Sequence, residues 1–186
     1  MDAGRLCQFA CSIAALACAM QCSLLAAQPA PQPVPEYQLK AAFVYNFALF
    51  TDWPMGILTA GGTLNICVNP DSPLRPALSS LNDRQIKGRR VVVQSVLPSN
   101  DAETLRMCHV LVLDGLDRER WSRIKKRLAA ASVLTVSDDG EIGHDGAVIA
   151  LYLDNDRIGF DIDVQAAKQA HLLLSSKLLR LARSVQ

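Results

Sequence analysis

Apolar side chains follow a helical repeat between Glu36 and Trp53, a segment that also holds six of the ten aromatic residues of the chain. The residues of the repeat, at steps of four, four and three, are Leu39, Phe43, Phe47 and Phe50. This spacing puts them on one face of a helix. The pattern therefore predicts an aromatic core helix that runs to about Trp53 and is stopped by Pro54.

Apolar residues surround most of this helix, and the polar exceptions are Lys40, Asn46 and Asp52. A helix that is apolar on most sides needs cover on most sides. We therefore expect the sheet of the same chain to cover one flank. A second chain, or the C-terminal helix, is expected to cover the other.

Short β-branched runs alternate with helical segments along the next part of the chain. The runs that predict strands are TLNICVN (63–69), RRVVVQSV (89–96), HVLVLDGL (109–116) and SVLTVSD (132–138). The segments that predict helices are 72–83, capped by Ser72, then 99–107 and 117–131. This alternation is typical of a sheet with helices on both faces.

The last part of the chain has a different pattern. The glycine-rich and acidic segment 138–146 predicts a loop, and 147–163 predicts a hairpin that turns at Asp154-Asn155-Asp156. A long helix is expected from Val164 to about Arg183. The fold class is α/β, with a mixed or mostly parallel sheet flanked by helices on both faces, and with a C-terminal β-hairpin followed by a long helix.

The N-terminal residues have the pattern of an export signal. Arg5 precedes a stretch, 6–27, without any charged side chain, and the stretch ends in small residues. This predicts a signal peptide over 1–27, with an uncleaved membrane anchor as the alternative. Alternate prolines then predict an extended tether over 28–35, followed by a single domain over 36–186. Export places the protein in the periplasm.

Removal of the signal would leave Cys67 and Cys108 as the cysteines of the chain. In an oxidising compartment these two most simply form a disulfide, and two unconnected buried thiols are the alternative. The geometry is not obvious, because Cys67 lies late in its predicted strand and Cys108 lies just before another. If the two strands were parallel neighbours without an offset, the cysteines would lie at opposite ends.

Motifs of enzymes are absent from the sequence: it has no glycine-rich phosphate loop, no G-x-S-x-G and no H-E-x-x-H, and its three histidines are scattered. The segment 138–146 offers the best candidate metal ligands, which are Asp138, Asp139, Glu141, His144 and Asp145. It lacks the order of a calcium loop, so ordinary turn chemistry is favoured. We predict no metal, no cofactor and no catalytic residue.

Cations outnumber anions in the predicted helix 117–131. They are Arg118, Arg120, Arg123, Lys125, Lys126 and Arg127, against Asp117 and Glu119. Nucleic acid would fit such a face in the cytoplasm, but export argues against it. Anionic lipid or an acidic protein surface is an alternative to a merely solvated face.

Several stretches together resemble the YfiR family of periplasmic regulators. They are the A-F-x-Y-N-F-x-x-F-x-x-W-P run from Ala42 to Pro54, the strands of Cys67 and Cys108, and the S-S-K-L-L run from Ser175 to Leu179. The resemblance implies a dimeric α/β repressor, not an enzyme, in which Cys67 and Cys108 form a structural disulfide. Its implied partners are the periplasmic domain of an inner-membrane diguanylate cyclase and an OmpA-like outer-membrane lipoprotein that releases the repression. Its implied output is cyclic di-GMP, and with it biofilm formation.

Candidate contact residues are polar breaks in the apolar helices and residues on the predicted hairpin. They are Asn46, Ser175 and Ser176 on the helices, and Tyr152, Arg157 and Phe160 on the hairpin. Two other functions stay open on the sequence: a periplasmic sensor that binds a small molecule, and a metal-dependent enzyme centred on 138–146.

Overall fold

The computed structural model describes residues 35–58, 62–97, 102–129, 131–155 and 157–186. The chain divides into two units, 1–33 and 34–186, and the second contains all the described residues. The predicted signal peptide, and the predicted tether except for Pro35, lie outside the described residues.

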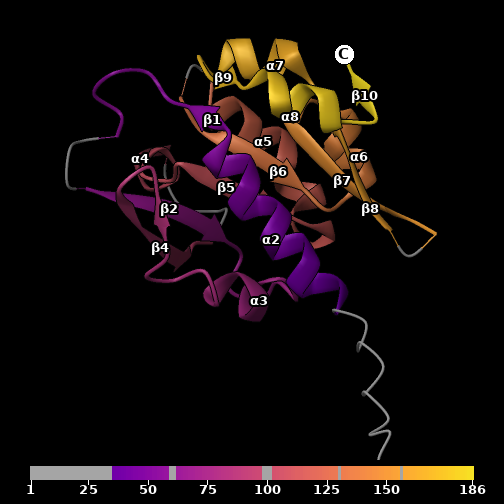
Figure 1. The fold of residues 1–186 in the computed structure, drawn as a ribbon, viewed down its shortest axis with the longest axis horizontal. Coiled ribbons are helices and arrows are strands. Elements are labelled where there is room, and N and C mark those ends of the chain that lie inside the picture. Colours follow the sequence, from indigo (N-terminus) through magenta and orange to yellow (C-terminus); the bar gives the residue numbers. More distant parts are fainter. Residues whose placement is uncertain (1–34, 59–61, 98–101, 130, 156) are drawn as a thin grey trace, which may run out of the picture. The chain divides into compact units, whose positions relative to one another are not determined.

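A mixed sheet forms the centre of the described part of the chain (Figure 1). Its eight strands, in spatial order, are β10 (Ser184–Val185), β8 (Arg157–Ile162), β7 (Ile149–Asp154), β6 (Leu134–Ser137), β5 (Val110–Leu113), β2 (Thr63–Val68), β4 (Arg89–Ser95) and β3 (Gln85–Ile86). Neighbours from β4 to β7 pair in parallel, whereas β3 with β4 and β7 with β8 are antiparallel. The predicted mostly parallel sheet and the predicted hairpin are confirmed.

Alternation along the strands creates a core on each face of the sheet. Ile66, Val110 and Val136 face one cluster, whereas Cys67 and Leu111 face the other. The first cluster is covered by α2 (Glu36–Leu49), α3 (Arg75–Ser79), α7 (Val164–Gln169) and α8 (Ser176–Leu181). The second is covered by α4 (Ala102–Arg106), the 3₁₀ helix η1 (Gly115–Arg120) with α5 (Trp121–Arg127), and α6 (Gly140–His144). Helices on both faces are thus confirmed.

Helix α2 crosses the near face of the sheet in Figure 1 and contributes most of its aromatic packing. Phe47 is 1% exposed, and its ring lies 4.9 Å from that of Phe160 on β8, centroid to centroid. Phe43 and Phe50 are only half-buried, because the most buried face runs through Ala41, Val44 and Ala48. Small side chains on this face let the helix approach the sheet closely.

The predicted helix end at Trp53 is wrong, because α2 ends at Leu49. Thr51 and Asp52 instead form β1 (Thr51–Asp52), which pairs antiparallel with β9 (Leu173–Leu174). The hydroxyl of Thr51 donates to the carbonyl of Phe47 at 2.7 Å and so gives a hydrogen-bond donor to one of the carbonyls in the last turn of the helix. A contact between distant parts of the chain therefore ends the helix before the proline does.

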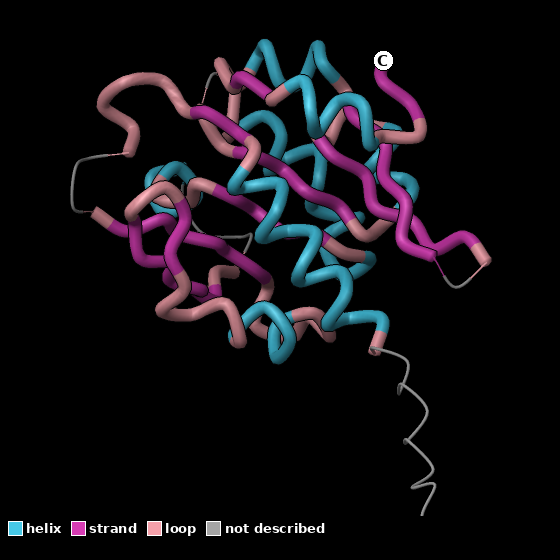
Figure 2. Tube along the Cα trace, in the orientation of Figure 1, coloured by secondary structure: helices cyan, strands magenta, loops and turns pink. Residues whose placement is uncertain are grey.

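The expected long C-terminal helix is also wrong. The segment forms α7, β9, α8 and β10 in turn, an alternation that is visible in Figure 2. His171 has a φ of 54° in the left-handed region, which ends α7. The Ser175 hydroxyl accepts from the Leu178 amide at 3.2 Å and caps α8. Two short helices thus replace one long one.

Two other boundaries differ from the prediction. The segment 138–146 is not a loop throughout, because the Asp139 carboxylate accepts from the amides of Glu141 and Ile142 and starts α6. The helix expected over 72–83 is confined to α3, and Ser72 lies before its N-cap residue Leu74. The cap at Asp139 therefore starts α6 inside the expected loop. The turn at Ser72-Pro73 delays the start of α3.

The Cys67–Cys108 disulfide is confirmed, with the Cα atoms 5.7 Å apart. The strands are parallel neighbours, with Ile66 opposite Val110. Cys108 lies outside β5, where its amide donates to the Leu105 carbonyl at 3.2 Å just after α4. It therefore meets Cys67 over the face of the sheet that α4 covers. The two cysteines can bond although their strands are parallel neighbours, because Cys108 is not part of its strand.

Candidate functional site

Polar residues gather where the parallel strands β2, β5 and β6 end. Asn69 follows β2, Asp114 follows β5, and Asp138 follows β6. After β2 the chain continues to β4 on one side and returns to β5 on the other, so the order of strands switches here. Ligands of open α/β sheets bind at this kind of edge, which makes it the first place to examine for a site.

Lys40 is buried at this edge although it belongs to α2. Its Nζ lies 2.6 Å from Asp138 Oδ1 and also contacts Glu36, one turn earlier. Burial alone would lower the pKa of Lys40, but the hydrogen bonds and charges of Asp138 and Glu36 outweigh it and raise the pKa. The ion pair fastens the first half of α2 to the end of β6.

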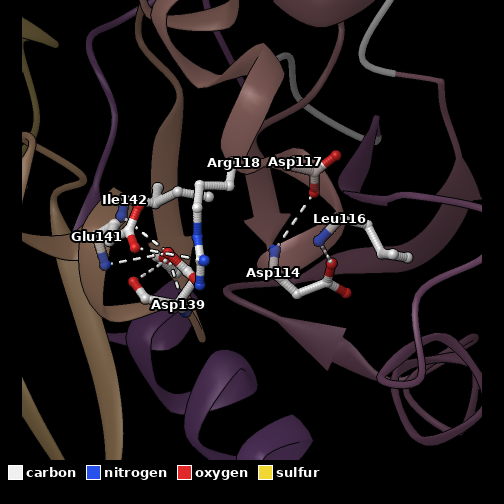
Figure 3. A network of polar contacts seen from close by, with 8 residues as sticks. Asp114, Leu116, Asp117, Arg118, Asp139, Glu141 and Ile142 are labelled. Carbon is white, nitrogen blue, oxygen red and sulfur yellow. Dashed lines mark hydrogen bonds and ion pairs between the residues drawn. The ribbon is translucent and has the colours of Figure 1, made fainter.

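Asp117 is fully buried and lies beside Asp114 (Figure 3). Its Oδ1 accepts from Asn69 Nδ2 at 3.0 Å, and its Oδ2 accepts from the Asp114 amide at 3.3 Å. Asp114 in turn accepts from the Leu116 amide at 2.9 Å. Burial raises the pKa of Asp117. These bonds close the turn that begins η1 and link it to the end of β2.

Asp139 is the centre of the other half of Figure 3. Its carboxylate pairs with Arg118 and accepts from two amides of α6 at 3.0 Å each. The hydrogen bond from Arg118 is the main reason that the pKa of Asp139 is lowered. Glu141 lies 3.3 Å from the same guanidinium. Arg118 therefore ties η1 to α6 across the edge.

Within the residues that the structure describes, no group of three or more His, Cys, Asp or Glu side chains could hold a metal ion. The carboxylates nominated in 138–146 have other partners: Asp138 pairs with Lys40, Asp139 and Glu141 with Arg118, and Asp145 with Lys125. What this edge does chemically is to join α2, η1 and α6 to the sheet.

The Lys40 ion pair predicts a specific loss of stability at alkaline pH. A lysine whose pKa is raised on folding stabilises the fold below its unfolded pKa, and this contribution is lost as pH rises through the folded pKa. Lys40→Met should therefore show a shallower fall in unfolding free energy above about pH 10, where a lysine side chain in the unfolded chain begins to lose its proton. Urea unfolding at stepped pH measures this.

The matched control is Lys177→Met, since Lys177 is exposed on α8. It should keep the alkaline slope of the wild type. Equal slopes in wild type and Lys40→Met would contradict the role of the ion pair.

A second candidate site is an exposed apolar surface formed by Trp53, Pro54, Met55 and Ile57 with Leu173 of β9, called the Trp-Pro platform below. Met55 is fully exposed, Leu173 is 72% exposed, and Ile57 is 44% exposed. The pairing of β1 with β9 brings the two segments together. Large apolar side chains left in water at one place are typical of interaction surfaces.

Basic side chains hold the platform in place. Lys87 Nζ donates to the Thr51 carbonyl at 2.6 Å and to Asp52 Oδ1 at 2.5 Å. Arg89 donates to the Leu58 carbonyl at 2.9 Å. The loop is therefore fixed to the hairpin of β3 and β4 rather than extending freely.

Trp53 lies between two hollows of the platform. One hollow, of about 340 Å³, contains Lys87 and Arg89, and the other, of about 430 Å³, contains Lys168, His171 and Leu173. The Trp53 Nε1 is buried and, in the described part of the chain, has no hydrogen-bond partner.

The ring of His109 packs edge-on against the ring of Trp53, with the ring centroids 6.4 Å apart and the ring planes nearly perpendicular. Its Nδ1 accepts from the Asn65 amide at 2.9 Å. Burial is the main cause that lowers the pKa of His109. The imidazole is therefore held neutral, which suits its role as packing under the indole.

The contact residues nominated from the sequence lie on separate elements. Asn46 is exposed on α2 and its amide donates to the Ala42 carbonyl at 2.8 Å. Ser175 is the cap of α8, and Ser176 is exposed beside it. Tyr152 and Arg157 line a hollow of about 340 Å³ on the β7–β8 hairpin.

Phe160, nominated as a contact residue, is not available for contact, because it is buried against Phe43 and Phe47. Leu151 is opposite Phe160 in the hairpin and Tyr152 is opposite Gly159, so the two pairs face opposite sides of the sheet. Tyr152 lies over Gly159, where a Cβ would come within 2.2 Å of its ring, and stacks on Arg183 at 4.1 Å. Arg183 also pairs with Asp161.

Sequence reasoning missed Met55 and Leu173 as exposed residues and Lys40 as a buried one. The position of Met55 directly after Trp53-Pro54, where the helix was expected to stop, could have indicated that it is exposed. Leu173 was hidden in a run of three leucines that resembled the interior of a helix. Lys40 gave no signal, because its partner Asp138 is far away in the sequence.

No helix in the described ranges is long and apolar enough to cross a membrane. The sequence model of a protein family described as YfiR/HmsC-like matches residues 37–183. Among curated proteins, no match was found.

Solved structures show the same fold. One is a conserved domain protein from Vibrio cholerae O1 biovar eltor, with a TM-score of 0.55, 11% identity and 81% of this chain covered. Another is an ABC domain in complex with L-Trp from Streptococcus pneumoniae, with a TM-score of 0.51, 8% identity and 81% covered. In both cases this chain spans 60% of the length of the other. At such low identity the likeness concerns the fold alone.

Proposed function

Because the chain belongs to the YfiR/HmsC-like family, we propose that it represses an inner-membrane diguanylate cyclase by binding the periplasmic domain of that enzyme, and that it catalyses no reaction itself. The observation that carries the proposal is the family match over residues 37–183. Membership of this family supports the more general role of a periplasmic regulator of a diguanylate cyclase.

Repression requires that the protein bind the inactive state of the cyclase more tightly than the active state. A ligand shifts a conformational equilibrium only by its difference in affinity for the two states. The coupling is reciprocal, so a cyclase held active should bind the protein more weakly.

The Trp-Pro platform is the surface that we assign to the cyclase. Its exposed methionine and leucine, beside a half-buried tryptophan, match the composition of interface centres, where Trp and Met are enriched. Lys87, Lys168 and His171 surround it. These flanks would suit a partner segment with apolar anchors and acidic neighbours.

Two further partners belong to the same proposal. One is a second copy of the chain in a homodimer, and the other is an OmpA-like outer-membrane lipoprotein that sequesters the protein and releases the cyclase. Both are supported by the sequence stretches that resemble the YfiR family.

The test begins with the protein as bait for co-purification from detergent-solubilised membranes of its own organism. The recovered cyclase is then assayed for cyclic di-GMP formation at increasing concentrations of the protein. Saturable inhibition is expected. Met55→Asp/Leu173→Asp should weaken inhibition about 10- to 100-fold, because two charges would enter an apolar contact.

Leu181→Asp is the matched control, since Leu181 is a 70% exposed leucine on α8 outside the platform. It should inhibit like the wild type. If both variants inhibit equally well, the platform is not the contact surface, and if the wild type does not inhibit at all, the repressor proposal fails.

The second candidate function is a small-molecule sensor. A hollow of about 400 Å³ between α6 and the hairpin is lined by Tyr152, Asp161 and Arg183 among others. This volume lies in the range of ligand pockets. Recovery of no cyclase, together with a metabolite that raises the melting temperature, would favour this function.

A further inference from the structure

We propose that the cationic face of η1 and α5 binds the phosphate headgroups of an anionic phospholipid membrane. This basic face consists of Arg120, Arg123 and Lys126. The inference goes beyond the proposed function and does not rest on it, because adsorption to a membrane requires no cyclase.

The orientation of α5 is fixed by its apolar side. Trp121, Ile124 and Leu128 are buried in the second core cluster. The indole Nε1 of Trp121 also donates to the Asp145 carbonyl at 3.1 Å. With this side against the sheet, the remaining positions of the helix must project away from it. Arg123 and Lys126 are accordingly exposed.

Four cations of this segment fall into two groups. Arg118 pairs with Asp139 and Glu141, and Lys125 Nζ lies 3.0 Å from Asp145 Oδ1. These two hold α6 and the turn after it. Over the described residues, by contrast, neither Arg123 nor Lys126 forms an ion pair. Their charge is available to another molecule.

Arg120 lies at the start of the basic face and folds over the end of η1. Its Nη2 donates to the Leu116 carbonyl at 3.3 Å, which is a neutral acceptor. Glu119 is an exposed anion between these cations and cancels only part of their charge. The balance of the face is therefore positive, although the whole chain carries a formal net charge of only +1.

The chemistry of the face favours a membrane over an acidic protein. Its aromatic residue, Trp121, is buried, and its exposed positions are long flexible cations without an aromatic anchor. Protein interfaces centre on aromatic and other large side chains that become buried in pockets of the partner. A layer of phosphate headgroups needs no such anchor. Leu116, which is 49% exposed beside Arg120, can enter the boundary between headgroups and acyl chains.

The experiment is vesicle co-sedimentation with the protein recovered from a periplasmic extract. Vesicles of phosphatidylcholine with about one third phosphatidylglycerol are compared with pure phosphatidylcholine vesicles at low salt. Binding to the anionic vesicles alone is expected. Each surface cation contributes about fivefold in partitioning, so Arg120→Gln/Arg123→Gln/Lys126→Gln should lose on the order of 100-fold.

The control removes the same charge elsewhere. Lys168→Gln/Lys177→Gln/Arg180→Gln changes three exposed cations of α7 and α8 and should bind nearly as well as the wild type. Absence of binding to anionic vesicles would overturn the proposal, as would equal losses in the two triple variants. Loss of cyclase binding in the basic-face variant, without any vesicle binding by the wild type, would assign the face to an acidic protein instead.

Discussion

Replacing Phe47 with alanine is expected to lower the free energy of unfolding by about 3 to 5 kcal/mol. Phe47 is among the largest fully buried side chains, and its ring packs on Phe43 and Phe160. Truncation removes apolar contact and leaves a cavity between α2 and β8 that a close-packed core refills only in part. Urea unfolding followed by circular dichroism measures the loss.

Tyr37→Ala is the control on the same helix, because Tyr37 is 42% exposed. It changes helix composition without opening a cavity, so its effect should stay below about 1 kcal/mol. A loss below about 1 kcal/mol for Phe47→Ala as well would mean that α2 is not packed on the sheet as described.

Removal of the disulfide by Cys67→Ser/Cys108→Ser is expected to destabilise the protein by about 4 kcal/mol. The bridge spans a sequence separation of 41 residues, and its loss frees the unfolded chain to adopt many more conformations. Both cysteines are replaced together because a single change would leave a buried thiol unpaired. The readout is the unfolding free energy in urea.

Reduction of the wild type offers an independent check. The protein should lose about the same stability when unfolded in excess reductant as the double variant loses. Its intact mass before reduction should be lower by two hydrogen atoms. A wild type that is already reduced, or that is equally stable with and without reductant, would contradict the structural role of the bridge.

The pattern of apolar residues predicted the elements that depend on local sequence. The strands of 63–68, 89–95, 110–113 and 134–137 were found where β-branched runs stand. The hairpin formed around Asn155, whose φ of 48° is tolerated by asparagine. The apolar side of α5 likewise follows the helical spacing of Trp121, Ile124 and Leu128, which are all buried.

The candidate sites were harder to predict, for a reason visible at Asp138. The sequence placed it among possible metal ligands, because neighbouring carboxylates are all that sequence shows. In the fold its partner is Lys40, which belongs to another element. The platform was missed for the same reason, since Leu173 reaches the Trp-Pro segment only through the pairing of β9 with β1.

Residue patterns were sufficient to predict the two-sided α/β fold and the family of the protein, because periodicity and motifs are local properties. They favoured a Cys67–Cys108 disulfide but left two free thiols open, and the fold confirms the disulfide. The tertiary structure alone decided where α2 stops, why the last helix is divided at His171, and which charges are neutralised. Those outcomes depend on hydrogen bonds and ion pairs between residues far apart in the chain. Such contacts stabilise the protein only after the sheet has formed and placed the partners next to each other.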